Sequence, residues 1–474
     1  MEKQVDVVII GAGSAGLSAA SEVRKQTDNF VVINAGHYGT SCARVACMPT
    51  KALIEAANAC HERRFLAELG VGGVEGLAID RRKIFEHVRR MRDGFTNGMI
   101  KSTQKLGDRN IEGHARFIDA NTIEVGDMVI KTGKAVIATG SRSIVPAAWD
   151  AFREHILITE EIFEVTDLPD TMAVIGLGAA GLEMAQALTR LGIRVTGIEL
   201  GDMVGGLSDP EVNKKMLEAL REEMDVQTGI RAELQAIDGG LEIDLNGTKL
   251  QVGKVLATMG RRPNVDKLGL ENLGIEIDAK GRVPYDSETL QLADLPIFIA
   301  GDANSYKPLL HEAVDEGHIA GFNAAGDEVH CFKRRTPLAI TFSSPDIVSV
   351  GKRYEQISDD DDCVIAGNDF TGQSRARMRM VNKGAMRMYA RKSDGLLLGA
   401  EMAIPAGEHI GHLLAIAIQK EATVVDLMQL PFYHPVIEEG FQSILRELQQ
   451  QLVHAKGSET ELLLCRSHAD EKLC

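Results

Sequence analysis

The stretch Val5-Asp6-Val7-Val8-Ile9-Ile10-Gly11-Ala12-Gly13-Ser14-Ala15-Gly16 decides the fold of this chain. The apolar run at residues 5–10 is typical of a buried parallel strand, and residues 17–23 follow it with a helix-like pattern. The three glycines between them suit a tight turn, close approach of the backbone to a pyrophosphate, and close packing of helix on strand. The stretch therefore predicts a dinucleotide-binding turn, with the pyrophosphate over the helix N-terminus.

A second copy of this pattern occurs at Gly176-Leu177-Gly178-Ala179-Ala180-Gly181, after the apolar residues 172–175 and before the helix-like residues 182–188. One match alone would fit a glycine-rich turn in any parallel sheet. Two matches, each followed at the same interval by a second apolar strand, indicate a duplicated nucleotide-binding unit.

The two following strands end in different residues. Residues 195–198 end at Glu199, a carboxylate of the kind that hydrogen-bonds the ribose hydroxyls of a dinucleotide. Asp202 is close behind it, and no Arg or Lys lies between Arg194 and Lys214, so the second site is expected to prefer NAD over NADP. Residues 30–33 end at Asn34, whose neutral amide hydrogen-bonds a ribose more weakly than a carboxylate does.

Cys42 and Cys47 lie between the two nucleotide patterns, in Gly39-Thr40-Ser41-Cys42-Ala43-Arg44-Val45-Ala46-Cys47-Met48-Pro49-Thr50-Lys51. In a regular helix this spacing gives about 7.5 Å of rise and roughly opposite faces, whereas a disulfide needs Cα atoms about 4.4 to 6.8 Å apart. We therefore expect a distorted turn and an easily reduced disulfide that opens and closes in a cycle. Pro49 suits the first turn of a helix whose N-terminus stabilises a thiolate. On spacing alone, two unrelated buried thiols remain the alternative.

Three further strands run into glycines at Gly140, Gly260 and Gly301, within residues 135–141, 255–263 and 297–302. The first two are interpreted as the same crossover in a duplicated domain, passing the chain from one domain to the other. Asp302, at the carboxyl end of the third strand, is placed to accept from a polyol such as a ribityl chain, the alternative being a surface turn.

Residues 432–439, Phe432-Tyr433-His434-Pro435-Val436-Ile437-Glu438-Glu439, place a carboxylate five residues after a histidine. If Glu439 holds the imidazole, it fixes the tautomer of His434 and stabilises the imidazolium, so His434 can act as a base that takes protons from thiols near neutrality. Taken alone, such a segment is more typical of an ordinary loop.

With these segments in this order, the chain resembles the pyridine-nucleotide disulfide oxidoreductases, and most closely the dihydrolipoyl dehydrogenases, over nearly its whole length. The resemblance implies FAD on the first pattern and a nicotinamide nucleotide on the second. It implies a homodimer in which His434, oriented by Glu439, acts as the base on the disulfide of the other subunit. Cys42 is then the interchange thiol and Cys47 the flavin-side thiolate.

The resemblance also implies an ion pair between Lys51 and Glu183 beside the flavin, and backbone contact of Ala313 with it. The cofactor-binding residues that it implies are Gly11, Gly13, Gly16, Asn34, Thr40, Lys51, Ala115, Thr139, Gly140, Ser141, Gly176, Gly178, Gly181, Glu183, Glu199, Gly260, Gly301, Asp302 and Ala313.

The expected function is therefore an FAD-dependent dithiol:NAD oxidoreductase of the dihydrolipoyl dehydrogenase type, with a small-molecule or protein-bound dithiol, such as a lipoyl group, as substrate. The chain departs from the family at Arg44 and Ala46, where Asn and Gly are usual, and in an extra residue before the disulfide. Two alternatives stay open: an NADH-dependent reductase of another disulfide, and a flavoprotein redox sensor or binding module with little turnover.

The composition of the chain limits the class of protein and the partners that it can have. The 474 residues are 44% hydrophobic and 25% charged, as in a globular protein with room for several domains. A net charge of −16 argues against nucleic acid or an anionic membrane as partner. The first predicted strand begins close to Met1 and no apolar run reaches membrane-spanning length, so neither a signal peptide nor a membrane span is expected. Only one pair among the seven cysteines is closely spaced, which suits a reducing compartment. We therefore expect a cytoplasmic protein. No metal site is expected from His311, His318, His409 and His412, which lack cysteine or acidic partners in a suitable pattern.

The expected fold is α/β, with two Rossmann-like nucleotide-binding domains and a C-terminal α+β dimerisation domain. We predict an FAD domain at residues 1–145 and 270–338, an NAD domain at 146–269, an interface domain at 339–456 and a tail at 457–474. Within these, residues 52–69, 410–420 and 440–451 are expected to be helical, with Cys60 as a buried small hydrophobe. The tail thiols Cys465 and Cys474 are neither adjacent nor in a rigid turn, so a third redox pair is the less favoured reading.

Overall fold

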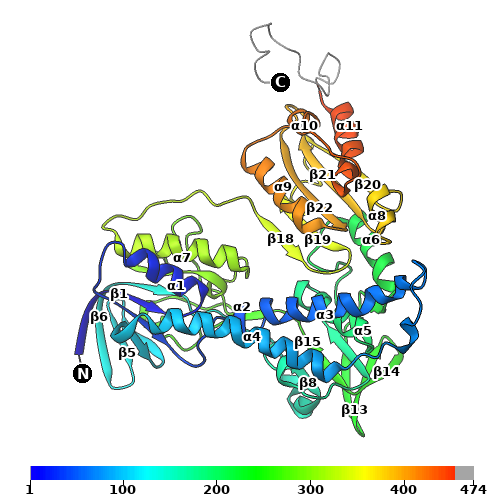
Figure 1. Ribbon diagram of the computed structural model, residues 1–474. Coiled ribbons are helices and arrows are strands. Elements are labelled where there is room, and N and C mark those ends of the chain that lie inside the picture. The colour runs from blue at the N-terminus through cyan, green and yellow to red at the C-terminus, as the bar shows by residue number, and fades with distance from the viewer. Residues whose placement is uncertain (1, 454–474) are drawn as a thin grey trace.

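The computed structural model describes residues 2–453, and the predicted tail with Cys465 and Cys474 lies outside the described residues. Three sheets of five or more strands organise the described chain, and two smaller sheets accompany them (Figure 1). The predicted α/β class, with two nucleotide-binding sheets and a third α+β unit, is confirmed. The exact domain boundaries stay a prediction.

The first sheet has seven strands in the order β3-β2-β1-β6-β5-β4, with β17 also paired to β6. Strands β1, β2, β3, β6 and β17 run parallel, while β4, β5 and β6 form an antiparallel meander. The strands are β1 (Glu2–Ile10), β2 (Phe30–Asn34), β3 (Asn110–Glu112), β4 (Ala115–Asp119), β5 (Thr122–Val125), β6 (Met128–Ile137) and β17 (Ile297–Ile299). Strand β17 thus returns to a sheet begun about 300 residues earlier in the sequence.

Helices α1 (Ser14–Val23) and α7 (Leu310–Ala325) lie side by side against this sheet (Figure 1). Small residues at their contact let the two backbones approach closely. A Cβ on Gly317 would lie 2.3 Å from the Ala15 carbonyl oxygen, and one on Gly321 would lie 2.6 Å from that of Ala19. The helix after the first nucleotide-binding turn is therefore fixed by α7 as well as by the sheet.

The second sheet is parallel, in the order β11-β10-β9-β15-β8, and α5 (Ala179–Arg190) packs on it directly after its glycine-rich turn. Its strands are β8 (Ile156–Ile158), β9 (Thr171–Ile175), β10 (Arg194–Ile198), β11 (Asp225–Gln227) and β15 (Lys254–Ala257). Beside it lie α6 (Pro210–Arg221) and the antiparallel strands β12 (Glu233–Ile237), β13 (Gly240–Leu245) and β14 (Thr248–Val252). The two crossovers form strands β7 (Ser141–Ser143) and β16 (Arg261–Pro263), which pair with each other between the two nucleotide-binding sheets.

The third sheet is antiparallel, in the order β18-β19-β22-β21-β20. Its strands are β18 (Leu338–Thr341), β19 (Asp346–Gly351), β20 (Cys363–Asp369), β21 (Ala385–Arg391) and β22 (Leu397–Ile404). The helices around it are α8 (Ser374–Met378), α9 (Gly407–Gln419), α10 (Val424–Met428) and α11 (Gln442–Gln451). The helix predicted at 440–451 is divided: a 3-10 helix covers Ile437–Phe441 and α11 follows it.

The remaining helices are α2 (Ser41–Arg44), α3 (Cys47–Leu66) and α4 (Arg81–Gln104). Helix α3 begins at Cys47 and stops three residues before the predicted end at Leu69, whose side chain is 67% exposed. Cys60 on α3 packs only partly buried against an apolar cluster that includes Leu53 and Ala57. Further 3-10 turns occur at Val74–Gly76, Gly107–Arg109, Ala147–His155, Ile162–Glu164, Leu270–Leu273, Gly301–Asn304 and Tyr354–Gln356.

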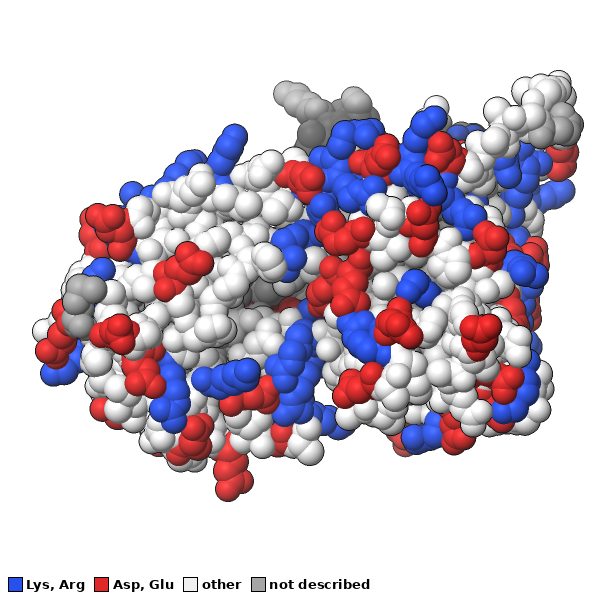
Figure 2. Space-filling model, turned by 90° about the horizontal axis from the view of Figure 1, so that it is seen from below, with Lys and Arg blue, Asp and Glu red and all other residues white. Residues whose placement is uncertain are grey.

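The surface carries both signs of charge. Figure 2 shows acidic and basic side chains interspersed over the face seen from below, although the whole chain has a net charge of −16. Within residues 2–453, no helix is both long enough and apolar enough to cross a bilayer.

Candidate functional site

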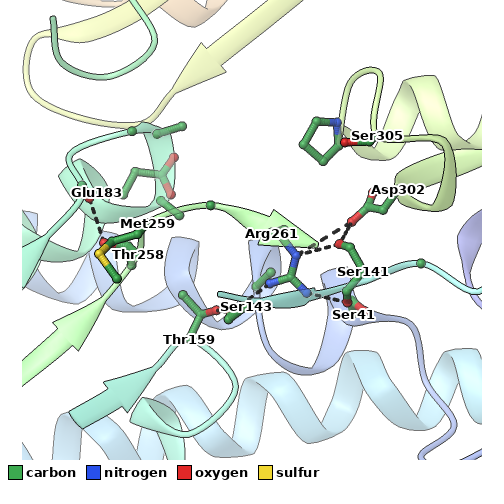
Figure 3. Close-up of a pocket in the computed structure, with 18 of the residues that line it drawn as sticks. Ser41, Ser141, Ser143, Thr159, Glu183, Thr258, Met259, Arg261, Asp302 and Ser305 are labelled. Atoms are coloured by element: carbon green, nitrogen blue, oxygen red, sulfur yellow. Dashed lines mark hydrogen bonds and ion pairs between the residues drawn. The ribbon is translucent and has the colours of Figure 1, made fainter. Parts of the chain in front are cut away.

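A cavity of about 1160 Å³ opens between the first and second sheets, and Figure 3 shows part of its wall. Both glycine-rich turns and the redox-cysteine segment contribute to it. The predicted site residues that line it are Gly13, Cys42, Cys47, Lys51, Gly140, Ser141, Gly176, Gly178, Glu183, Glu199, Gly260, Gly301, Asp302 and Ala313. Those not among its lining residues are Gly11, Gly16, Asn34, Thr40, Ala115, Thr139, Gly181, His434 and Glu439.

The glycine-rich turns leave room where a nucleotide would lie. Gly11 has φ +115°, and a Cβ on Gly16 would lie 1.8 Å from the Gly11 carbonyl oxygen, so both glycines are needed to form the turn. A Cβ on Gly13 or on Gly178 would meet no heavy atom within 4 Å, because these two glycines face open space. The buried Thr139 hydroxyl, in addition, has no hydrogen-bond partner within the described chain. These features fit two bound dinucleotides.

Asn34 and Glu199 hold equivalent positions at the ends of β2 and β10. Asn34 Oδ1 accepts from the Ala12 backbone N–H at 3.2 Å, and Glu199 Oε2 accepts from that of Leu177 at 2.6 Å. Each side chain therefore braces its own glycine-rich turn. Glu199 also lines the cavity, whereas Asn34 does not. The contact that the structure shows for the Asn34 amide oxygen is therefore with its turn and not with the cavity.

The chain is bent between Cys42 and Cys47. Helix α2 ends after Arg44, Ala46 has the non-helical angles φ −125° and ψ −99°, and α3 begins at Cys47. Thr40 caps α2 by accepting from the Ala43 N–H at 3.2 Å. The predicted distorted turn is confirmed, and both thiols are free in this structure.

The two thiols differ in acidity. A hydrogen bond from Cys42 and the charge of Lys51 outweigh burial and lower the pKa of Cys47 to about 7. The same contact with Cys47, together with burial, raises the pKa of Cys42 well above its ordinary value. Cys47 is therefore the thiol that carries the negative charge near neutral pH.

Lys51 is held against α5. Its Nζ lies 2.8 Å from both carboxylate oxygens of Glu183, and Glu183 Oε1 also accepts from the Phe342 backbone N–H at 2.9 Å. The Lys51 ammonium stacks over the Phe342 ring, 4.8 Å from its centroid. Helices α3 and α5 and the residue that follows β18 thus meet at this ion pair.

Arg261 forms a polar cluster at the junction of β7 and β16 (Figure 3). Its guanidinium donates to Ser141 Oγ at 2.8 Å and lies 3.0 Å from Glu160, while Ser141 Oγ donates to Asp302 at 2.7 Å. Burial opposes ionisation of Glu160, but the Ser143 hydroxyl and Arg261 lower its pKa. Neither Arg261 nor Glu160 was predicted as a site residue. Arg261 directly follows the predicted Gly260, whereas Glu160 carries no local signal.

The turn that carries Asp302 is held by the buried carboxylate of Glu316. Glu316 Oε2 accepts from the Gly301 backbone N–H and from Asn304 Nδ2, both at 2.7 Å, and its other oxygen lies 2.8 Å from Arg334. This carboxylate holds the turn that presents Asp302 to the cavity. Glu316 was missed as a site residue, because nothing in the local pattern of α7 separates it from its neighbours.

His434 and Glu439 form a hydrogen-bonded pair at the surface of the third unit. His434 Nδ1 lies 2.9 Å from Glu439 Oε1, while Glu439 Oε2 accepts from the Val436 N–H at 2.9 Å. Both contacts lower the pKa of Glu439. The His434 side chain is 75% exposed, so a single chain does not bring this pair to the cavity that holds the thiols. In the part of the chain that the structure describes, no group of three or more His, Cys, Asp or Glu is arranged to hold a metal.

Two dinucleotide-binding turns that share one cavity with a pair of unequal thiols define a nucleotide-dependent thiol redox protein. The family model described as pyridine nucleotide-disulphide oxidoreductase matches residues 5–317, and the model of that family's dimerisation domain matches residues 338–444. The chain therefore belongs to the pyridine nucleotide-disulphide oxidoreductases. Members of this family use FAD and NAD(H), which agrees with the two turns described above.

Similar proteins support this assignment. The dihydrolipoyl dehydrogenase of Geobacillus stearothermophilus is 30% identical over 92% of this chain and 94% of its own length. The mitochondrial dihydrolipoyl dehydrogenase of Rattus norvegicus is 27% identical over 92% and 89%. Among solved structures, the HOCl-induced flavoprotein disulfide reductase RclA from Escherichia coli aligns with a TM-score of 0.80 at 20% identity, covering 93% of this chain and 99% of that chain. LpdA from Mycobacterium tuberculosis aligns with a TM-score of 0.81 at 24% identity, covering 94% and 100%. These two structures share the fold.

Proposed function

We propose that this protein is a dithiol:NAD oxidoreductase of the dihydrolipoyl dehydrogenase type, in which Cys42 and Cys47 form the redox-active pair. The observation that carries the proposal is the position of both cysteines in the wall of the cavity shared by the two nucleotide-binding turns, beside Lys51. The similarity to dihydrolipoyl dehydrogenases over most of the chain supports the lipoyl group as the substrate class.

The proposed chemistry begins with the oxidised pair. A thiolate of the substrate attacks the Cys42 sulfur, breaks the Cys42–Cys47 bond and releases Cys47 as a thiolate, so that a mixed disulfide forms. The second substrate thiol then attacks the substrate sulfur of that mixed disulfide and displaces Cys42. The substrate leaves as a disulfide, and the two electrons remain on the cysteine pair.

The acidity of Cys47 suits its role as the group released in the first step, because a thiol with a lower pKa leaves faster. Lys51 stabilises the thiolate so formed. FAD and NAD, when bound, supply the hydride chemistry that reoxidises the pair. Asp302, held by Ser141 and by the Glu316-supported turn, is proposed to accept from the polyol chain of the flavin.

The base is proposed to come from a second subunit. His434 is exposed and does not line the cavity of its own chain, and the chain contains the family's dimerisation domain. We infer a homodimer in which His434 of the partner subunit takes the protons of the substrate thiols. Glu439 would orient that imidazole and stabilise its charged form.

Absorbance of the purified holoprotein tests the proposal. A flavin spectrum that gains a long-wavelength thiolate-to-flavin band on addition of NADH supports it, and Cys47→Ser is expected to abolish the band. Cys331→Ser removes an exposed thiol elsewhere in the chain and should leave the band unchanged. A protein that binds no flavin would contradict the proposal.

Substrate comparison separates the second candidate, an NADH-dependent reductase of another disulfide. Arg44, next to the redox pair in place of the usual Asn, is the feature that favours it, because a cation there suits an anionic disulfide. Rates with dihydrolipoamide and NAD are compared with rates for glutathione disulfide and other disulfides with NADH. Dihydrolipoamide should be turned over at least tenfold faster than any of them. A flavoprotein that turns over none of these substrates would instead be a sensor or binding module.

A further inference from the structure

Helix α8 and its C-terminal capping residue carry exposed cations that we call the arginine rim: Arg375 and Arg377 on the helix and Arg379 at its end, with Met378 between the last two. All three arginines are exposed, and Met378 is 62% exposed. Within residues 2–453, none of the three guanidinium groups makes a hydrogen bond or an ion pair. Burial raises the pKa of Asp346 to about 7, and the positive charge of Arg379 partly opposes this rise without forming an ion pair.

The arginine rim is fixed beside the segment that contains His434 and Glu439. Gln373 caps α8 by accepting from the Ala376 N–H at 2.7 Å, and its Nε2 donates to the Val436 carbonyl at 2.6 Å. One strand earlier, Asn368 Nδ2 donates to the Gly440 carbonyl at 3.0 Å. A partner bound at the rim is therefore held next to the proposed base.

Two carboxylates on elements near the rim already have lysine partners. Asp369 lies 3.0 Å from Lys215, and Glu222 lies 2.7 Å from Lys383. The chain as a whole is acidic, with 68 Asp and Glu against 52 Lys and Arg. Three exposed arginines within five residues, none of them in an ion pair within residues 2–453, are thus a local concentration of positive charge that suits an acidic surface.

We propose that the arginine rim docks an acidic face of the protein that carries the dithiol substrate. The proposal rests on the proposed function and names its partner as an acidic carrier domain. Arginine pairs with carboxylates through two parallel hydrogen bonds, and the adaptable Met378 side chain offers an apolar contact between the charged groups. Docking at α8 would bring the tethered dithiol close to His434. In the proposed homodimer, His434 lies beside the cysteine pair of the other subunit, so the dithiol would also reach that pair.

A charge-removal variant of the holoenzyme tests the docking. In Arg375→Gln/Arg377→Gln/Arg379→Gln, kcat/KM for a reduced lipoylated carrier domain with an acidic face is expected to fall about tenfold at low ionic strength, mainly through KM. The same ratio for free dihydrolipoamide should stay within about twofold, because that substrate does not need the rim. Raising the salt concentration should slow wild type with the carrier and leave the variant nearly unaffected.

The matched control is Arg24→Gln/Lys267→Gln/Lys280→Gln, which removes the same charge from exposed positions on the first unit. The reciprocal arm uses the carrier domain with its acidic face changed to amides, which should lower kcat/KM with wild type and not with the rim variant. A rim variant that behaves like the control overturns the docking proposal. So does dissociation of the rim variant's subunits in sedimentation, since the rim would then be a subunit contact.

Failure of the proposed function has a different signature. Wild type would then oxidise neither free dihydrolipoamide nor the reduced carrier. Calorimetric titration of the carrier domain into wild type and rim variant reports docking without turnover, and equal affinities would overturn the docking alone.

Discussion

Lys51 and Glu183 meet across 132 residues of sequence, with Nζ 2.8 Å from both carboxylate oxygens. The pair joins the helix that starts at Cys47 to the helix that follows the second glycine-rich turn. Its two charges act in opposite directions on the pKa of Cys47, which Lys51 lowers and Glu183 raises.

Lys51→Met is therefore expected to raise the pKa of Cys47 above about 7, and Glu183→Gln to lower it. In the reduced protein, thiolate absorbance at 240 nm should appear at a midpoint about one pH unit higher in the lysine variant. The glutamate variant should move the midpoint the other way. Midpoints that do not move, or that move together, would show that this ion pair does not set the acidity of Cys47.

His434→Gln should slow dithiol oxidation by roughly 100- to 10,000-fold and leave flavin content unchanged, because a general base is lost without disturbing the cavity. Glu439→Gln should cost less, since the imidazole remains. His409→Gln is the matched control: its side chain is 74% exposed and lies 3.5 Å from Glu408. Stopped-flow reduction by dihydrolipoamide measures the step, and unchanged turnover in the His434 variant would remove it from the mechanism.

Glu316→Ala should weaken flavin retention by about tenfold. The change leaves the Gly301 N–H and Asn304 Nδ2 without their buried acceptor and frees the turn that carries Asp302, while Arg334 keeps its contact with Glu312. Equilibrium dialysis of the flavin measures the loss, with Glu328→Ala as an exposed control. A flavin dissociation constant equal to that of the control would show that this turn needs no such support.

Asp209→Ala should destabilise the fold by about 3 to 5 kcal/mol. Asp209 is fully buried, caps α6, and accepts from Arg387 at 3.0 Å and from Tyr389 at 2.9 Å. It thereby joins the second unit to the third sheet. The midpoint of urea unfolding measures the effect, and the exposed control Asp294→Ala should stay within about 0.5 kcal/mol of wild type. A wild-type midpoint for Asp209→Ala would refute the assignment.

The features that were predicted most accurately from the sequence are each formed by a few consecutive residues. The turns at Gly11 and Gly176 and the bend between Cys42 and Cys47 depend on local backbone geometry, so glycine positions and cysteine spacing reveal them. The His434–Glu439 hydrogen bond is local in the same sense. The ends of helices were less accurate: α3 begins five residues before the predicted Ala52, and the last helix is divided at Phe441.

The sequence by itself determined the two glycine-rich turns, the bend between Cys42 and Cys47 and the order of the units, because each is a pattern of neighbouring residues. Only the tertiary structure decided which side chains share the cavity. It places Arg261 between Ser141 and Glu160, sets Glu316 beneath Asp302, and leaves Asn34 outside the cavity wall. Such contacts depend on how the sheets and helices pack, and packing brings together residues whose separation along the chain carries no local signal.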